Sequence, residues 1–385
     1  MALKRTLHCF NALKDGKQKK LDDFLTVCER QTNYFLGYPC NPEFDYSSLY
    51  PFLNYPLNNV GDPYEPSNIH FQTHEFEREV LAFFGKLLHA PTDNFWGYVN
   101  NGGTEGNMYG AYLGRELFPN GIVYYSEDTH YSVAKILRIV HAKSIMIKSQ
   151  KNGEIDYQDL AETIHIHRDY PPIIFANIGT TMKGAIDDIA KIKQIIHAHD
   201  IHKYYIHADA ALSGMILPFV DEPQAFRFSD GIDSISISGH KMLGSPIPCG
   251  IVLAKKRHVD RVSRAIEYIG SYDTTISGSR NGVTPLFLWY AIHTRGIDGF
   301  RQITQQCFEI ADYAIHQFQT AGIKAWRNKN SITVVFPRIA PTALKRWQIA
   351  VNNNDAHLIT MPHIGKKHID NFLNAILEEI KHETA

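Results

Sequence analysis

The stretch Ser236-Ile-Ser-Gly-His-Lys241 places a lysine just beyond an apolar run that is typical of a buried strand. An earlier run, Tyr204-Tyr-Ile206, leads into His207-Ala-Asp209, so an aspartate ends another strand. Pyridoxal 5'-phosphate (PLP) needs both groups, because an amine forms a Schiff base with its aldehyde and a carboxylate pairs with its pyridine nitrogen. Asp209 and Lys241 together therefore predict a PLP site.

The composition is that of a folded protein with a small-molecule partner. The 385 residues are 44% hydrophobic, enough for one large domain and a smaller one. Lys and Arg (39) balance Asp and Glu (40), so neither nucleic acid nor an anionic membrane is favoured as a partner. The N-terminus lacks the apolar core of a signal peptide, and no run reaches the ~20 apolar residues of a membrane span. Five scattered cysteines without a C-x-x-C pair suit a reducing compartment, and we expect a cytoplasmic protein: Cys9, Cys28, Cys40, Cys249 and Cys307.

Short apolar runs alternate with segments of helical periodicity from about residue 75 onward, which predicts an α/β domain on a mostly parallel sheet. In the segment 188–202, one helix face is shared by Ile189, Ile192, Ile195 and Ile196, with Asp187 or Asp188 as the cap. The run 250–254 follows the Lys241 loop after only about a dozen residues, too few for a crossover helix, so this strand should be antiparallel. The other predicted strands are 122–125, 145–147, 173–176, 204–206 and 234–237.

The composition and the pattern of predicted helices and strands change at both ends of the chain. Residues 1–60 are rich in Tyr, Asn and Pro after one predicted helix, 21–31, and we interpret them as an N-terminal arm. Residues 61–295 form the predicted PLP-binding domain. A helix over 302–320, strands at 332–336 and 357–360 and a helix over 369–380 then predict a small α+β C-terminal domain, 296–385.

A glycine-rich turn should meet Asp209 and Lys241 at one edge of the sheet, and two further polar segments follow predicted strands. Asn100-Asn-Gly-Gly-Thr-Glu-Gly-Asn107 precedes a helical stretch, where glycines let backbone N–H groups approach a phosphate. His130 is placed to stack on an aromatic ring. Thr180 and Thr181 offer hydroxyl groups to a cofactor. Each segment alone is also compatible with an ordinary turn.

Six motifs occur together in the order and approximate spacing of the group II PLP-dependent decarboxylases, and the chain resembles that family over nearly its whole length. The resemblance implies the PLP-dependent transferase-like fold (fold type I), with a mostly parallel seven-stranded sheet containing one antiparallel strand. It also implies a homodimer with shared active sites, or a higher oligomer, in which the loop 278–282 reaches the neighbouring site. The motifs are Asn101-Gly-Gly-Thr-Glu105, Thr129-His-Tyr131, Gly179-Thr-Thr181, His207-Ala-Asp209, Ser238-Gly-His-Lys241 and Gly278-Ser-Arg-Asn-Gly282.

The resemblance assigns a role to each matching position. Lys241 would be the Schiff-base lysine, Asp209 the partner of the pyridinium nitrogen, and His130 the residue that stacks on the ring and helps to bind substrate. Ala211 would pack on the other ring face and Thr181 would lie near the phenolic oxygen. The phosphate would be held by Gly103, Thr104, Ser238 and His240.

Within the family the chain is most similar to the bacterial enzymes that act on histidine, which implies decarboxylation of L-histidine to histamine and CO2. Tyr272 and Tyr268 are candidates to return a proton to Cα, in a polar segment, 267–277, suited to a lid. Either tyrosine can equally be a packing residue at a subunit interface. The substrate pocket would be lined by Tyr38, Asn58, Asn59 and His130.

Other classes of protein are weaker matches. A serine decarboxylase is the nearest alternative, followed by an aminotransferase of the same fold, whereas an inactive scaffold would be expected to lack Lys241 or Asp209. The histidine-dense segments 165–167 and 197–202 lack the i, i+4 pair with a carboxylate that favours a helical zinc site, so we expect no metal.

Overall fold

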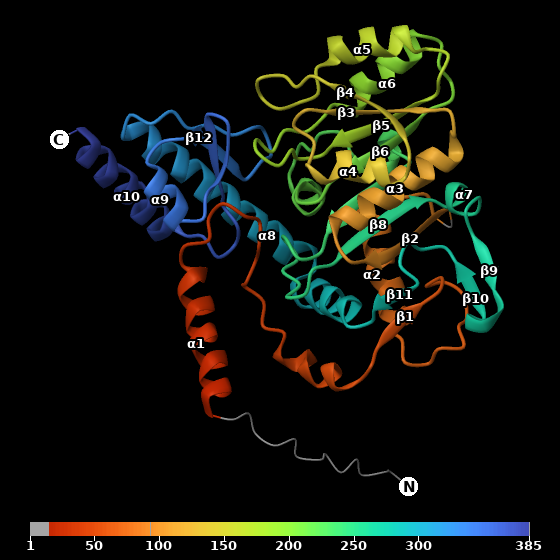
Figure 1. Ribbon diagram of the computed structural model, residues 1–385, viewed down its shortest axis with the longest axis horizontal. Helices are drawn as coiled ribbons and strands as arrows, with labels where there is room; N and C mark the ends of the chain where they lie inside the picture. Colours follow the sequence, from red (N-terminus) through yellow and green to blue (C-terminus); the bar gives the residue numbers. More distant parts are fainter. Residues whose placement is uncertain (1–14, 93, 385) are drawn as a thin grey trace.

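The computed structural model describes residues 15–92 and 94–384, and a seven-stranded sheet forms its centre (Figure 1). The strand order is β2-β8-β7-β6-β5-β3-β4. Strand β8 runs antiparallel to both neighbours and the remaining pairs are parallel, as predicted from the short connection before it. The strands are β2 (Phe95–Asn100), β3 (Ile122–Ser126), β4 (Lys143–Ile147), β5 (Pro172–Asn177), β6 (Tyr205–Asp209), β7 (Ser234–Ser238) and β8 (Gly250–Lys255).

Helices cover both faces of this sheet, so its central strands β5, β6 and β7 are buried along their whole length. Alternate residues of β5 point to opposite faces: Ile173 and Phe175 join one apolar cluster, and Ile174 and Ala176 join the other. The first cluster includes residues of α3 (Gly103–Leu117) and α4 (Ser132–Ile139). The second includes residues of α2 (His74–Leu87), α5 (Tyr157–Ile166) and α6 (Ile189–Ala198).

Helix α6 confirms the predicted cap and corrects the predicted end. The Asp188 side chain accepts hydrogen bonds from the backbone N–H groups of Ala190 and Lys191. The helix ends at Ala198 and not at residue 202, because Asp200 adopts a left-handed conformation with φ of 54°. A left-handed residue cannot continue an α-helix.

The C-terminal part combines a three-stranded antiparallel sheet with helices. Helix α8 (Thr284–Thr320) begins 18 residues before the predicted start and bends at Gly296, where φ is 61° and ψ is −178°. It leads to β12 (Thr333–Pro337), β13 (Ala350–Asn352) and β14 (Asp355–Ile359), with α9 (Pro341–Arg346) and α10 (Lys366–Thr384) alongside. The boundaries at 60/61 and 295/296 stay predictions. No described helix is both long and apolar enough to cross a membrane.

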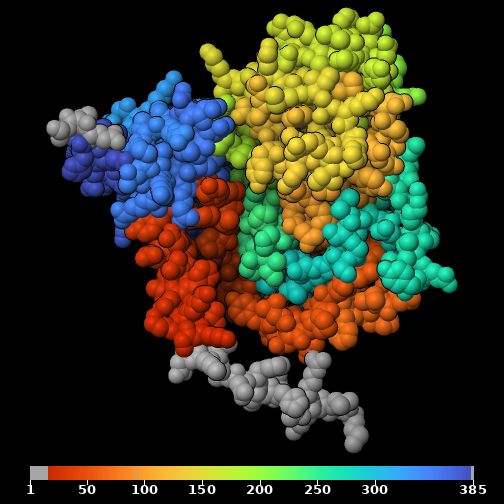
Figure 2. All heavy atoms as spheres, viewed as in Figure 1, coloured from red at the N-terminus to blue at the C-terminus, as the bar shows by residue number. Residues whose placement is uncertain are grey.

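The N-terminal segment contacts both the small sheet and the main domain. Helix α1 (Asp15–Thr32) projects from the molecule in Figures 1 and 2, and all of its described side chains are exposed. Leu36 then donates a backbone hydrogen bond to Trp347, while Asn41 and Tyr46 bond to the carbonyl groups of Met242 and Leu243. The segment therefore passes directly beside Lys241. Cys9 and the stretch considered for a signal peptide lie outside the described residues.

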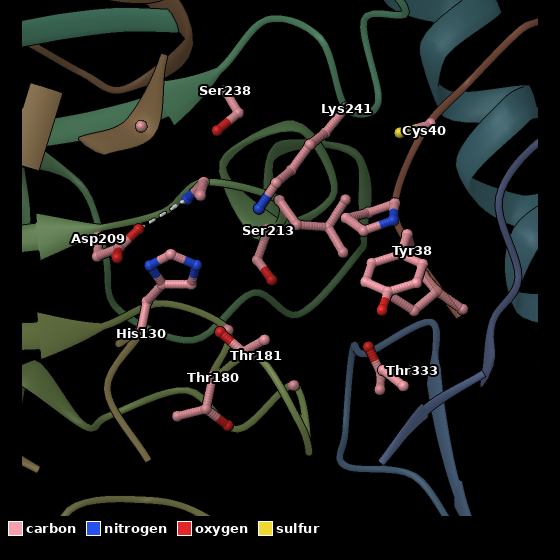
Figure 3. A pocket seen from close by; sticks show the side chains of 18 of the residues that line it. Tyr38, Cys40, His130, Thr180, Thr181, Asp209, Ser213, Ser238, Lys241 and Thr333 are labelled. Carbon is pink, nitrogen blue, oxygen red and sulfur yellow. Dashed lines mark hydrogen bonds between the residues drawn. The ribbon is translucent and has the colours of Figure 1, made fainter. Parts of the chain in front are cut away.

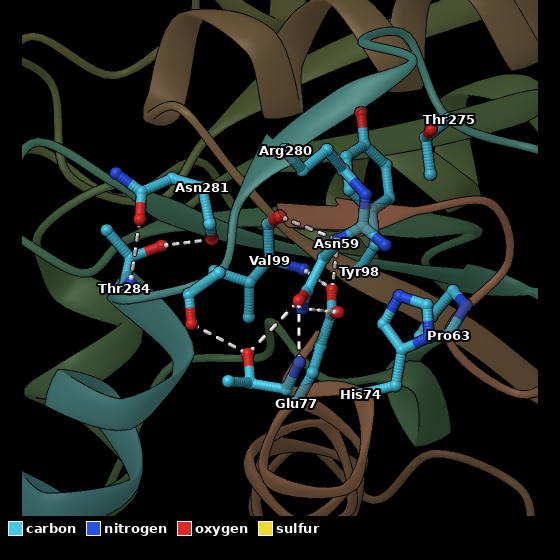
Figure 4. Close-up of polar contacts among 12 residues, drawn as sticks. Asn59, Pro63, His74, Glu77, Tyr98, Val99, Thr275, Arg280, Asn281 and Thr284 are labelled. Carbon is cyan, nitrogen blue, oxygen red and sulfur yellow. Dashed lines mark hydrogen bonds and ion pairs between the residues drawn. The ribbon is translucent and has the colours of Figure 1, made fainter. Parts of the chain in front are cut away.

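A buried ion pair between α2 and the region that follows β8 lies beside the end of this segment. The 3-10 helix η1 (Ser47–Asn54) leads to β1 (Asn58–Val60), which pairs with β11 (Ser279–Asn281). Beneath this pairing, Arg280 donates to Glu77, and Glu77 also accepts from Asn59 and from the backbone N–H of Val99 (Figure 4). Between β8 and β11 lie α7 (Lys256–Val259) and a hairpin of β9 (Arg264–Ile266) and β10 (Ser271–Asp273), joined by the 3-10 turn η5 (Glu267–Ile269).

Candidate active site

A cavity of about 540 Å³ opens at the carboxyl ends of β5, β6 and β7, as expected for a ligand site in a parallel sheet. Asn177, Asp209 and Ser238, each the last residue of its strand, line it from the large domain. Thr333 and His357 line it from the small sheet. Figure 3 shows the side chains of Asp209 and His130 on one side of the cavity, Tyr38 and Thr333 on the other, and the Lys241 amine between them.

Lys241 presents an amine that no described residue binds through a hydrogen bond or ion pair. Its pKa is lowered by burial, although the Asp209 carboxylate and the Cys40 thiol oppose the shift. A lowered pKa increases the fraction of neutral amine near neutral pH, and the neutral amine is the form that attacks a carbonyl carbon. Lys241 therefore has the properties of a Schiff-base lysine.

Asp209 ends β6 and is 7% exposed. Its Oδ2 accepts a hydrogen bond of 2.7 Å from Nδ2 of Asn107, and its Oδ1 accepts one of 3.2 Å from the backbone N–H of Ala211. Each carboxylate oxygen keeps a further lone pair, so the group can also accept a hydrogen bond from a protonated ring nitrogen. Both oxygens of the Asp209 carboxylate can therefore still accept a hydrogen bond from a ligand.

His130 is half-buried beside Asp209 and contacts Ser132 through Nδ1 at 2.8 Å. Burial lowers the pKa of His130, while Asp209 raises it and Lys241 lowers it further. A lowered pKa keeps the imidazole neutral at pH 7, and a neutral flat ring can stack on an aromatic cofactor. The predicted stacking role is compatible with this geometry.

The turn before α3 forms a cradle for an anion. Helix α3 begins at Gly103 after Gly102, whose φ of 132° favours glycine, and no side chain caps the helix. A Cβ at Gly103 would lie 3.0 Å from the Ser238 hydroxyl, so glycine keeps this space open. His240 contacts the Cys249 carbonyl through Nδ1 at 2.9 Å, which leaves Nε2 for a ligand. Uncapped N–H groups, a hydroxyl and an imidazole suit a phosphate group.

These residues together fit PLP. The cradle at Gly103, Thr104, Ser238 and His240 would hold the phosphate, Lys241 would hold the aldehyde carbon, and Asp209 the pyridine nitrogen. When bound, PLP supplies an aromatic ring that accepts the electron pair of the bond that breaks at Cα of an amino acid.

The structure brings most of the predicted site residues into this one cavity. Beyond those already described, Ala211, Thr181 and Tyr38 line it, and Tyr38 is 48% exposed and stacks on Phe35 with ring centroids 5.5 Å apart. Asn58 and Asn59, which were also predicted to line the substrate pocket, do not line this cavity of their own chain. Both belong to β1, where Asn58 pairs with β11 and Asn59 is buried against Glu77 and Thr73.

The candidate proton donors lie outside the cavity of their own chain. Tyr272 is on β10 and 44% exposed, and Tyr268 is 85% exposed on the turn before it. The segment considered for a lid is thus part of a hairpin whose tyrosines face solvent. The role of either residue in protonating Cα stays a prediction.

Sequence reasoning missed several residues that line the cavity. Thr333 and His357 come from the small sheet and Ser331 from the chain just before β12. None carries a local signal, because only the packing of the two sheets brings them to the site. Cys40 also lines the cavity, and no sequence pattern around it indicates this position. Asn107 ends the glycine-rich turn in the sequence, and in the structure its amide on α3 contacts Asp209.

Comparison with known proteins agrees with this geometry. A conserved-domain profile described as "Pyridoxal-dependent decarboxylase conserved domain" matches residues 68–337, more than half of the chain. The chain belongs to the pyridoxal-dependent decarboxylase family. As a member of this family it uses PLP as cofactor and is a carboxy-lyase. Among residues 15–92 and 94–384, no group of three or more His, Cys, Asp or Glu side chains is arranged to hold a metal ion.

Relatives of this decarboxylase resemble it over nearly their full length. It is 51% identical to a histidine decarboxylase of Morganella morganii over 370 residues, covering 95% of this chain and 98% of the relative. A histidine decarboxylase of Pseudomonas fluorescens is 50% identical over 371 residues, covering 96% and 91%. Among solved structures, L-methionine decarboxylase from Streptomyces sp. 590 superposes with a TM-score of 0.86 at 23% identity, covering 95% of each chain. This likeness shows that the decarboxylase has fold type I, as predicted.

Proposed function

We propose that this protein is a PLP-dependent histidine decarboxylase, which converts L-histidine to histamine and CO2. The observation that carries the proposal is the convergence of Lys241, Asp209 and His130 in one cavity with an anion cradle at Gly103. Support for histidine as substrate comes from the curated histidine decarboxylases, which are about half identical over almost the whole chain.

The residues of the cavity divide the reaction between them. Lys241 would hold PLP through its amine and could accept or donate a proton beside the substrate. Asp209 would accept a hydrogen bond from the pyridine nitrogen, which would keep the ring able to accept electrons. His130 and Ala211 would contact the two faces of the ring, and Thr181 would contact its phenolic oxygen. Tyr272 remains our candidate for the proton that Cα receives.

Tyr38 is our candidate for contact with the substrate side chain. It lies across the cavity from Asp209 (Figure 3), which is the direction left open for a side chain once the ring nitrogen is held at Asp209. An aromatic ring and hydroxyl there can stack on an imidazole and bond to its nitrogen. Serine, the alternative substrate, is too short to use this contact.

The test is to incubate the purified, PLP-loaded protein with each of the twenty amino acids and to identify the amine that forms. Histamine from histidine is the expected product. Ethanolamine without histamine would show that the enzyme is a serine decarboxylase, and keto-acid products would show an aminotransferase. An otherwise identical sample of Lys241→Ala should release no amine.

We also propose that the enzyme acts as a homodimer or a higher oligomer in the cytoplasm. Leu21, Phe24, Leu25 and Cys28 share one face of α1 at helical spacing, and all are exposed although three are large and apolar. A second copy would bury this face. Phe24→Glu should lower the mass measured by sedimentation equilibrium, whereas Thr26→Glu, on the opposite face, should not. An unchanged mass for Phe24→Glu would show that α1 is not the interface.

The position of Tyr272 agrees with shared active sites. Tyr272 does not reach the cavity of its own chain, so it acts either from a neighbouring subunit or after the hairpin moves. Tyr272→Phe should slow product release more than substrate binding, because the hydroxyl is needed only after CO2 has left. Normal turnover of this variant would exclude it as the donor.

A further inference from the structure

A buried chain of polar side chains leads to Asp209 from the interior of the protein. Tyr205, His207 and Asp209 alternate along β6 and so face the same side of the sheet, on which α3 packs. Tyr205 and His207 have no exposed surface, and Asn107 of α3 is 2% exposed. Helix α3 comes close enough only because residue 110 is glycine, since a Cβ there would lie 2.1 Å from Nδ1 of His207.

The hydrogen bonds nearest to Asp209 have only one consistent direction. An ionised carboxylate only accepts, so Asn107 must turn Nδ2 towards Oδ2 of Asp209, at 2.7 Å. The amide oxygen of Asn107 then faces Nε2 of His207 at 3.1 Å. Because an amide oxygen only accepts, Nε2 of His207 must carry the proton.

The remaining bonds continue in the same direction. Burial lowers the pKa of His207 to about 3, so the ring is neutral and has a single N–H, at Nε2. Its Nδ1 therefore accepts from the Ser234 hydroxyl at 2.7 Å, and the Ser234 oxygen accepts from the Tyr205 hydroxyl at 2.8 Å. Every donor in the series points towards the Asp209 carboxylate, and such aligned bonds strengthen one another in a buried setting.

We propose that His207 and Asn107 are positioning residues that hold the Asp209 carboxylate in the orientation that the pyridinium nitrogen of PLP would require. The inference rests on the role proposed for Asp209. Neither residue needs to touch substrate: Asn107 supplies the N–H that binds Oδ2, and His207 fixes which end of the Asn107 amide faces the carboxylate. A rotated amide would place an oxygen against Oδ2 and repel it.

The test compares variants that keep or remove the donor. His207→Gln retains an N–H that can reach Asn107, whereas His207→Leu fills similar space without one. Asn107→Asp keeps the shape and replaces the donor with a second carboxylate. We expect Asn107→Asp and His207→Leu to raise the Kd for PLP, measured by titrating the apoprotein, and to lower kcat, each by roughly 10- to 100-fold. KM for the amino acid should be unchanged, and His207→Gln should recover most of the loss. His197→Gln, the same change at an exposed site on α6, is the control.

Two results would overturn the inference. One is a Kd for PLP and a kcat equal to those of the parent in Asn107→Asp, with a normal circular dichroism spectrum. The other is an equal loss in His207→Gln and His207→Leu, because packing and not hydrogen bonding would then be responsible. If His207→Leu does not fold, Asn107→Asp and His207→Gln still decide the question. Failure of the proposed function is distinguishable, since Asp209→Ala would then leave turnover unaffected.

Discussion

Replacement of Arg280 by methionine should destabilise the fold strongly, although Arg280 does not line the active-site cavity. Arg280 is 3% exposed and donates to Glu77, to the Val99 carbonyl at 3.2 Å and to the Gly61 carbonyl at 3.0 Å (Figure 4). Methionine has a similar length but leaves the Glu77 carboxylate, which has no exposed surface, without its cation. Breaking one side of a buried ion pair costs about 3–5 kcal/mol.

The assay is urea unfolding followed by tryptophan fluorescence at saturating PLP, so that cofactor binding contributes equally to each sample. Arg280→Met should lower the free energy of unfolding by about 3–5 kcal/mol. Adding Glu77→Gln to it should cost less than the sum of the two single changes, because each single change removes the same interaction. Arg301→Met, which breaks an exposed ion pair with Asp298 on α8, should have little effect. A loss in the free energy of unfolding below about 1 kcal/mol in Arg280→Met would refute the reasoning, because removal of an exposed ion pair already costs up to that amount.

Three further predictions concern the cofactor site. Asp209→Ala should keep the absorption band of PLP bound to Lys241 yet lose most turnover, and near-normal turnover would refute the role of Asp209. Because the pKa of His207 falls from 6.5 to about 3 on folding, the unfolded chain binds an extra proton between these values. The His207 contribution is therefore complete above pH 6.5 and falls by about 1.4 kcal/mol per pH unit below it. Unfolding curves at several pH values should show a shallower acid slope for His207→Gln, and parallel slopes would contradict this. Finally, PLP at 100 times its Kd should stabilise the protein by about 2.7 kcal/mol. Pyridoxal without phosphate at the same concentration should give a smaller rise in Tm, and an equal rise would rule out the cradle at Gly103.

The sheet and the centre of the site follow from local patterns in the sequence. Strand 250–254 was predicted antiparallel because its connection is too short for a helix, and β8 confirms this. Lys241, Asp209, His130 and the turn at Gly103 were predicted to converge because parallel strands end at one edge of a sheet, and the cavity contains all four. The spacing of apolar residues and the relative direction of successive strands depend on residues that are close together in the chain. A single sequence therefore predicts them well.

Contacts between distant segments could not be predicted in the same way. Asn58 and Asn59 were predicted to line the substrate pocket, yet they lie outside the cavity of their own chain. Their strand pairs with β11, more than 200 residues further along the chain, and Asn59 also bonds to Glu77 of the nearby helix α2. Thr333 and His357 were missed for the same reason, since nothing near them in the sequence indicates which surface the small sheet will face.

The most direct test of the central claim uses L-histidine labelled with ¹³C at its carboxyl carbon. The purified enzyme, with and without PLP, would be incubated with this substrate, and labelled CO2 and histamine would be measured in the same sample. We predict equal amounts of the two products, formed only when PLP is present. Histidine recovered intact with PLP bound, or labelled carbon retained in the product, would contradict the assignment of this protein as a histidine decarboxylase.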